Sequence, residues 1–241
     1  TFNEVARQRL EDNLVAELYV DASDEAHFRR YLERHLPSIL ADPEMEIGRK
    51  ADILYLSAQG LAREILVDPK MEGGIDRGKF MVEQTVDFML SQKGTLSHLL
   101  RTASNDHFAY THSVNACVYS LALVQKIGPA DAADLQEFGT GALLRDVGMS
   151  LVDRKISERR GPLTPAEFEA VKQHPVLGES LLLETGGLTP AALDVVRHHH
   201  EKVDGSGYPD GLSESDIHPY VRACTIADIF DALSTNRSHR K

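Results

Sequence analysis

The chain has 241 residues, of which 42% are hydrophobic and 26% are charged. This is the composition of an ordinary globular protein, and it excludes collagen-like, low-complexity and wholly disordered chains. Lys and Arg number 26 and Asp and Glu number 37, which gives a formal charge of −11. We therefore expect no nucleic-acid partner, and any anionic substrate must be met by local cations.

No apolar run approaches the ~18 residues that a membrane helix needs, and the first residues lack the pattern of a signal peptide. We therefore expect a cytoplasmic protein without membrane insertion. The chain begins without Met and ends at Lys241, so we interpret it as a fragment. Cys117 and Cys224 lie far apart within apolar helical patterns, which predicts buried free thiols rather than a disulfide. The oligomeric state stays open.

Apolar residues recur at three- and four-residue steps along nearly the whole chain, which predicts an all-α fold. Helices are expected over residues 23–40, 48–67 and 76–92 in the first part and over residues 95–104 at the start of the second. Breaks fall at Asp42-Pro43 and between Met71 and Gly74. The run from Leu14 to Val20 is the best strand candidate, although its length also suits a helix. Residues 1–94 are predicted to form a small, mainly helical amino-terminal module with a sensory or regulatory role.

The second part, residues 95–241, has clearer helix signals and most of the histidines. Thr164-Pro165 with Glu167 forms a capping box with Pro at the first helical position, and Thr189-Pro190 opens another helix in the same way. Gly186-Gly187 ends the helix between them. Eight of the eleven histidines lie after residue 106, and this asymmetry points to a function for them.

Three successive histidines, His198 to His200, close the helix that begins after Thr189. Neutral imidazole is the commonest metal ligand in proteins, so these residues are candidate ligands, with a solvated polar helix end as the alternative. The glycine-rich stretch that follows is typical of a tight surface turn. We expect the turn Gly207-Tyr208-Pro209 to expose its tyrosine and to offer a contact for a protein partner.

Two carboxylates lie in apolar surroundings. Asp146 ends an apolar helical run, and Asp228 lies in a run that is apolar nearly all round apart from Asp228 and Asp231. A buried carboxylate is costly unless it is paired or binds a metal, so the alternative to a ligand role is a salt bridge. His112 and His174, each taken alone, suit a structural role. The combined set offers nitrogen and oxygen donors that suit Fe, Mn or Zn better than Ca or Mg: His112, His174, His199, His200, Asp146 and Asp228.

The order and spacing of these residues resemble the HD-GYP domain, a subgroup of the HD metal-dependent phosphohydrolases that hydrolyses the bacterial messenger cyclic di-GMP. The matching stretches are His112-Ser113, Leu144 to Gly148, Pro162-Leu163-Thr164 with Glu167, His174-Pro175 with Gly178, His199 to Glu201, Asp204 to Pro209 with Gly211-Leu212, and Ala227 to Leu233. The resemblance extends from His112 to Arg240, a little over half of the chain. It implies an HD-type helical bundle over residues 95–241 that lacks the family's customary last helices.

The resemblance also implies a centre for two metal ions. The first position would use the histidine of the family's His-Asp pair together with His112, Asp146 and Asp228. The second position would use His174, His199 and His200, with Asp146 bridging. Two divalent ions would activate the attacking water and neutralise charge on the phosphoryl oxygens. Arg237 and Arg240 match basic positions that would contact the phosphates and guanine of the substrate. The alternative is that both side chains are simply solvated.

The sequence departs from the family pattern mainly at the first metal position. Arg145 replaces the histidine of the His-Asp pair, and a guanidinium stays protonated and cannot bind a metal. Met149 replaces the usual lysine, and Phe108 replaces a glutamate that binds a third metal in some members. Ser238-His239 replaces the usual Pro-Tyr of the last motif. We therefore expect one divalent transition-metal ion, Fe or Mn before Zn or Ni, with two ions as the alternative.

These features predict a bacterial cyclic di-GMP phosphodiesterase that yields pGpG or GMP and is attenuated by the loss of one ligand. One alternative is a degenerate domain that keeps a metal and a nucleotide pocket and acts as a sensor or protein-interaction module. Another is a different phosphate ester as substrate. Arg145 could also take the place of the missing ion, by pairing with Asp228 or by holding a phosphate.

Overall fold

The computed structural model describes residues 4–234, apart from residues 16, 104–107, 129, 158 and 160. The α-helices are α1 (Glu4–Asp12), α2 (Glu25–Ala41), α3 (Ile47–Val67), α4 (Gly74–Ser91), α5 (Thr95–Thr102), α6 (Ala109–Ile127), α7 (Ala132–Leu144), α8 (Arg154–Ser157), α9 (Pro165–Val171), α10 (His174–Thr185), α11 (Pro190–His198) and α12 (Pro219–Ser234), with 3₁₀ turns η1 (Ala22–Asp24), η2 (Val147–Leu151) and η3 (Glu214–Asp216). The described residues contain no β-strand, so the prediction of an all-α fold is confirmed. Among them, no helix is both long enough and apolar enough to span a bilayer.

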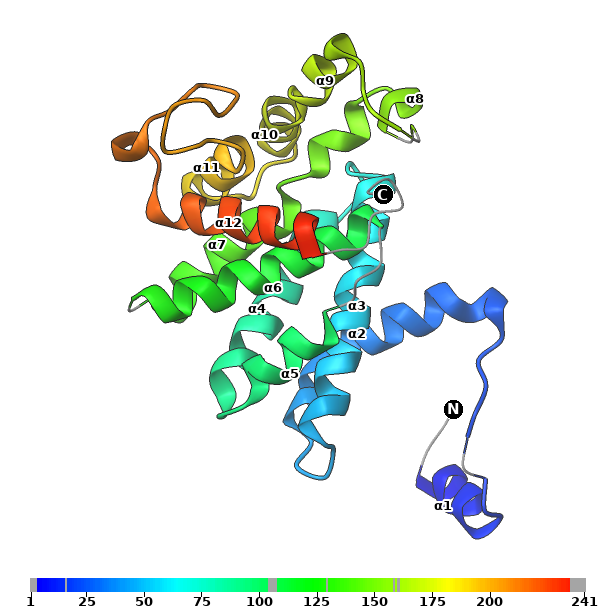
Figure 1. The fold of residues 1–241 in the computed structure, drawn as a ribbon. Helices are drawn as coiled ribbons and strands as arrows, with labels where there is room; N and C mark the ends of the chain where they lie inside the picture. The colour runs from blue at the N-terminus through cyan, green and yellow to red at the C-terminus, as the bar shows by residue number, and fades with distance from the viewer. Residues whose placement is uncertain are drawn as a thin grey trace.

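The helix ends follow the local signals in the sequence. Thr164 caps α9 by accepting a hydrogen bond from the Glu167 amide, and the Glu167 carboxylate accepts one from the Thr164 amide. Thr189 caps α11, and Gly186, with φ of 77°, ends α10. The run from Leu14 to Val20 is different, because its described residues form neither a strand nor a helix. Their large apolar side chains are exposed, and α1 lies away from the other helices (Figure 1), so the run has no surface to pack against.

One hydrophobic core joins the two parts of the chain. Helix α6 packs against α3, α7 and α12, and α4 packs against α7 (Figure 1). A single cluster of buried side chains extends from Leu36 in α2 to Cys224 in α12. Cys117 and Cys224 are both buried and free, as expected. A domain boundary at residue 94 stays a prediction, and the two parts share this interior.

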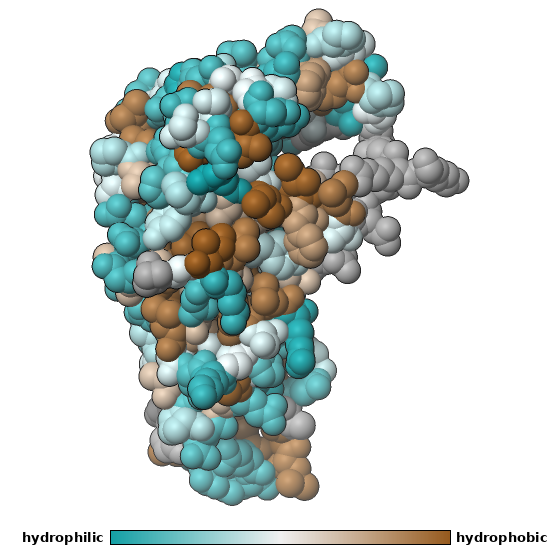
Figure 2. Space-filling model, turned by 60° about the vertical axis from the view of Figure 1, so that its left-hand side comes forward, coloured by the Kyte–Doolittle hydropathy of each residue, from teal (hydrophilic) through white to brown (hydrophobic). Residues whose placement is uncertain are grey.

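Helix α12 turns two carboxylates inward and an apolar face outward. Figure 2 shows hydrophobic side chains gathered across the middle of one face of the molecule. Large side chains of α12 that are about half exposed or more follow the spacing i, i+3, i+4, i+7 of a single helix face: Ile226, Ile229, Phe230 and Leu233. Asp228 and Asp231 are buried on the other side. These two carboxylates therefore need partners inside the protein.

Candidate metal centre

Four side chains from three places in the chain converge on one point. Their ligand atoms all lie within 4.8 Å of one another, and they belong to Asp146, His174, His199 and His200. Asp146 lies between α7 and η2, His174 begins α10, and the two other histidines follow α11. The Nε2 atoms of His174 and His199 lie 3.5 and 3.6 Å from Asp146 Oδ1. The structure thus brings together the four residues expected at the second metal position.

Two of these imidazoles are oriented by the backbone. Nδ1 of His174 lies 2.8 Å from the Val171 carbonyl oxygen, and Nδ1 of His199 lies 2.8 Å from that of Val196. A carbonyl only accepts, so each Nδ1 carries a proton, and in the neutral form of each ring the lone pair lies on Nε2. These Nε2 atoms lie 3.2 Å apart beside the Asp146 carboxylate. Two lone pairs this close repel each other unless a cation lies between them, so the donor set fits a divalent metal ion.

The charge states of the ligands also suit a metal. Burial lowers the pKa of His174 below its usual value, and burial together with His199 lowers the pKa of His200 to about 2. These rings are therefore neutral at pH 7, which is the form that binds metal. Burial opposes ionisation of Asp146, but the Arg145 guanidinium and His199 outweigh it and hold the pKa of that carboxyl well below its usual range.

A glycine sets the distance between Asp146 and His174. A Cβ atom on Gly148 would lie 2.0 Å from the His174 carbonyl oxygen and 2.5 Å from the Gly178 amide nitrogen. Only a glycine allows η2 to lie this close to α10. The sequence analysis lists Gly148 and Gly178 only as matches to the family pattern. Their close contact allows Asp146 to lie beside His174.

Arg145 lies between two of the carboxylates expected at the first metal position, Asp146 and Asp228. Its side chain is completely buried, and it donates to Asp228 Oδ1 from Nε at 3.1 Å and from Nη2 at 2.9 Å. Nη2 also lies 3.0 Å from Asp146 Oδ2, and Nη1 donates to the Ala142 carbonyl oxygen at 3.0 Å. Burial alone would lower the pKa of the guanidinium, but Asp146 and Asp228 outweigh it and raise that pKa. The alternative in which Arg145 pairs with Asp228 is confirmed.

His112 lies between two carboxylates beside Arg145. Its Nε2 lies 2.9 Å from Asp228 Oδ1, and its Nδ1 lies 2.6 Å from Asp231 Oδ2. Burial and the Arg145 guanidinium would lower the pKa of His112, but its bonds to Asp228 and Asp231 outweigh them and raise it. His112, Asp146 and Asp228 are close enough to hold an ion together, and a ligand role for His112 stays a prediction. Sequence reasoning did not assign Asp231 to the site, although its spacing from Asp228 places both on one helix face.

Tyr208 is half-buried, so the expectation that its turn exposes it is wrong. Its ring centroid lies 4.8 Å from that of His200, and Lys172 Nζ lies 5.8 Å from the tyrosine ring. The buried Glu201 carboxylate draws the loop inward by accepting hydrogen bonds of 2.7–3.0 Å from the backbone amides of Asp210, Gly211 and Leu212. Burial raises the pKa of Tyr208 above its usual value. The turn is thus a wall of the site.

The two arginines expected to contact substrate, Arg237 and Arg240, lie outside the described residues, as does Ser238-His239. Phe108 is exposed and stacks on Tyr110, with ring centroids 5.1 Å apart.

A family model described as "HD domain" matches residues 94–241. The chain belongs to the HD domain family. HD domains bind divalent metal ions, and the cluster around Asp146 offers the ligands for one. A cyclic di-GMP phosphodiesterase of Pseudomonas aeruginosa is 30% identical over 97% of this chain and 59% of its own length. A 3'3'-cGAMP-specific phosphodiesterase of Vibrio cholerae is 36% identical over 54% of this chain and 28% of its own length.

The fold of this HD domain protein also matches a solved structure. A protein of Bdellovibrio bacteriovorus described as an HDG"Y"P protein superposes with a TM-score of 0.73 and 24% identity, over 100% of this chain and 78% of that one. The resemblance to the HD family and the HD-type helical fold are confirmed. The chain spans less than two thirds of the length of the two phosphodiesterases named above.

Proposed function

We propose that this HD domain hydrolyses cyclic di-GMP at a single-metal centre, with reduced turnover. The observation that carries the proposal is the convergence of the imidazoles of His174, His199 and His200 on the Asp146 carboxylate. The ligands of the ion would be Asp146, His174, His199 and His200. Fe or Mn is the preferred metal and Zn or Ni the alternative, because the set is rich in nitrogen. Such an ion would supply Lewis acidity toward water and toward a phosphoryl oxygen.

Arg145 explains the reduced turnover. Its guanidinium supplies a positive charge between Asp146 and Asp228, where the family has a histidine ligand. A guanidinium offsets negative charge, but it has no lone pair with which to bind a metal and cannot activate water. The proposed centre therefore lacks one of the two electrostatic clamps on the reacting phosphate. Removing a comparable stabilising group costs ~10²–10³ in rate.

The relatives support a cyclic dinucleotide as substrate, since their names include cyclic di-GMP and 3'3'-cGAMP. Both carry phosphodiester anions, which a chain of charge −11 can bind only at local cations. Lys172 lies near the Tyr208 ring at the edge of the cluster and supplies one cation. Arg237 and Arg240 are proposed to supply others, and the product would be pGpG or GMP. A location in the bacterial cytoplasm belongs to the same proposal.

A second candidate function is a binding module that keeps the metal and the nucleotide pocket without hydrolysis. The observation that favours it is the pairing of Arg145 with both carboxylates, because Asp228 is satisfied there without an ion. In that case the wall formed by Gly207, Tyr208 and Pro209 would offer the contact for a protein partner.

Metal analysis and product analysis of the same samples test the proposal. We would measure the metal content of the full chain before and after addition of Mn²⁺ or Fe²⁺, and the conversion of cyclic di-GMP and of 3'3'-cGAMP to linear products. His200→Ala removes a ligand, and His27→Ala, at an exposed residue, is the matched control. One ion per chain with slow hydrolysis, both lost only in His200→Ala, would support the proposal. Metal and nucleotide binding without hydrolysis would favour the binding module, and two ions with rapid turnover would contradict the attenuation.

A further inference from the structure

A chain of buried hydrogen bonds joins helix α3 to the candidate metal centre. The Tyr55 hydroxyl donates to Asn115 Oδ1 at 2.6 Å, and Asn115 Nδ2 donates to Asp231 Oδ1 at 2.7 Å. The other oxygen of Asp231 lies 2.6 Å from His112 Nδ1. Tyr55, Asn115 and Asp231 are each at most 3% exposed. The hydrogen bonds among these three residues therefore connect α3, α6 and α12 out of contact with solvent.

The direction of each bond in this chain is fixed by chemistry. An amide side chain has one accepting end and one donating end, so a hydroxyl that donates to Asn115 Oδ1 leaves Nδ2 to face Asp231. A carboxylate only accepts, so His112 must donate from Nδ1. The His112 ring is then held with Nε2 toward Asp228, 2.9 Å away. Each member of the chain orients the next.

We propose that Tyr55 is a positioning residue of this centre, because through Asn115 and Asp231 it holds the His112 ring against Asp228. Asp228 in turn shares the Arg145 guanidinium with Asp146, the carboxylate of the metal cluster. Tyr55 lies before residue 94, outside the region that the HD family model matches. The site is therefore built in part by a helix from the amino-terminal part of the chain. This inference goes beyond the proposed function and holds for any substrate.

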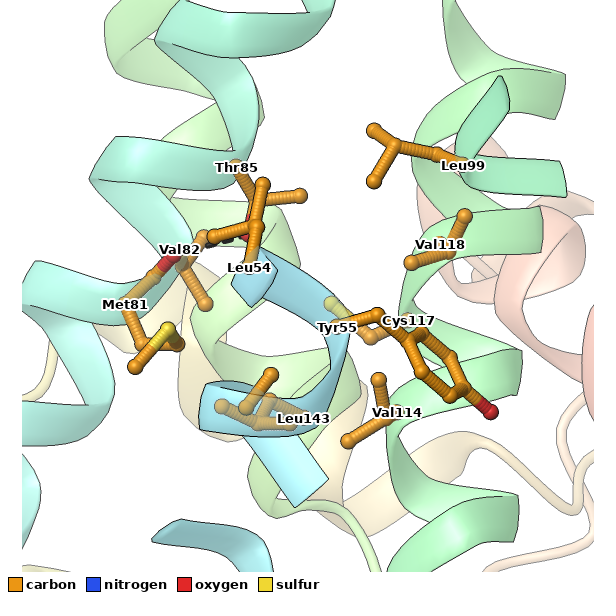
Figure 3. Close-up of a pocket in the computed structure, with 11 residues that line it drawn as sticks. Leu54, Tyr55, Met81, Val82, Thr85, Leu99, Val114, Cys117, Val118 and Leu143 are labelled. Atoms are coloured by element: carbon orange, nitrogen blue, oxygen red, sulfur yellow. Dashed lines mark hydrogen bonds between the residues drawn. The ribbon is translucent and has the colours of Figure 1, made fainter. Parts of the chain in front are cut away.

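The aromatic ring and the hydroxyl of Tyr55 have different surroundings. The ring lines a small apolar pocket between α3, α4 and α6. The hydroxyl is directed away from Met81 and Val82 (Figure 3). Thr85 lines the same pocket, and its hydroxyl donates to the Met81 carbonyl oxygen of its own helix at 2.8 Å. Thr85→Val thus removes a buried hydroxyl from the same pocket without touching the chain of bonds. It is the matched control for Tyr55→Phe.

Hydrogen exchange of the His112 Nδ1 proton, followed by NMR on the ¹⁵N-labelled full chain, tests the inference. His112→Gln assigns the signal. In Tyr55→Phe we expect this proton to exchange about tenfold faster than in the wild type, since a buried hydrogen bond of the chain is lost. In Thr85→Val we expect the wild-type rate. The amide proton of Val118, which is buried in α6, is measured in the same samples.

The Val118 amide separates local opening from general loss of stability. A positioning role is supported if the His112 Nδ1 proton exchanges faster in Tyr55→Phe while the Val118 amide proton does not, and if Thr85→Val shows no such effect. An unchanged His112 proton in Tyr55→Phe would overturn the proposal. So would equal acceleration at His112 and Val118, or the same effect in Thr85→Val, because each would mean that Tyr55 acts only through core stability.

Discussion

The Arg145 guanidinium donates two hydrogen bonds to a single carboxylate oxygen of Asp228, from Nε at 3.1 Å and from Nη2 at 2.9 Å. The same side chain reaches Asp146 Oδ2 at 3.0 Å. One fixed positive charge therefore neutralises two carboxylates, at the position where the HD-GYP resemblance implies a histidine. This charge belongs to the chain, so a chelator cannot remove it.

Arg145→His should make the stability of the fold depend on metal. Without an ion, Asp146 and Asp228 lose their buried cation, and breaking a buried ion pair costs ~3–5 kcal/mol. With Mn²⁺ or Fe²⁺, the new imidazole would restore a ligand, so we expect more bound metal and faster hydrolysis of cyclic di-GMP than in the wild type. Thermal unfolding with and without metal, metal analysis and steady-state kinetics check this. Loss of hydrolysis with unchanged metal content would contradict this prediction and would show that hydrolysis requires the Arg145 guanidinium.

Gly148→Ala should weaken metal binding. Its new Cβ would lie 2.0 Å from the His174 carbonyl oxygen, so η2 and α10 must separate and Asp146 must move away from His174. Outer-shell changes of this kind typically lower metal affinity ~10–100-fold. Gly128→Ala is the control, because a Cβ there meets nothing within 4 Å. Titration against a metal chelator measures both variants, and equal affinities would contradict the role of the glycine contact.

Glu201→Gln should loosen the loop that carries Tyr208. The Glu201 carboxylate accepts three backbone N–H bonds, and the new amide would turn a donor toward at least one of them. Leaving a buried donor unsatisfied costs ~1–3 kcal/mol, so the free energy of unfolding in urea should fall by about that amount. Glu214→Gln removes a carboxylate whose side chain is 73% exposed and should change little. A similar loss in both variants would show that the loop does not depend on Glu201.

The two cysteines should be unreactive in the folded protein. Burial raises the pKa of Cys117 to about 12 and that of Cys224 to about 12. A thiol reagent attacks the thiolate, which is nearly absent at pH 8 when the pKa is this high. A colorimetric thiol assay at pH 8 should therefore detect almost no thiol in the native chain and two per chain after unfolding in denaturant. Rapid reaction of the native chain would show that one of these cysteines opens to solvent.

The sequence predicts those features whose cause is local. The Thr164 cap depends on residues three positions apart, and the ligands around His199 follow a motif, so both can be recognised from the residues alone. The bond from Tyr55 to Asn115 joins residues 60 positions apart, and no local pattern contains it. The expected position of Tyr208 was wrong for a similar reason, because a Gly-flanked turn is typical of the surface unless a buried acceptor such as Glu201 draws it in.

The continuous core has a consequence for how the chain can be divided. Helices α3 and α4 cover apolar surface of α6 and α7, so a shortened chain that begins at residue 94 would leave that surface bare and prone to self-association. The whole chain should instead melt in one cooperative step. Any signal that loosens α3 or α4 would then lower the stability of the metal-binding half by the same amount. Such a signal would act on the metal-binding half by destabilising the shared core, without moving one rigid domain against another.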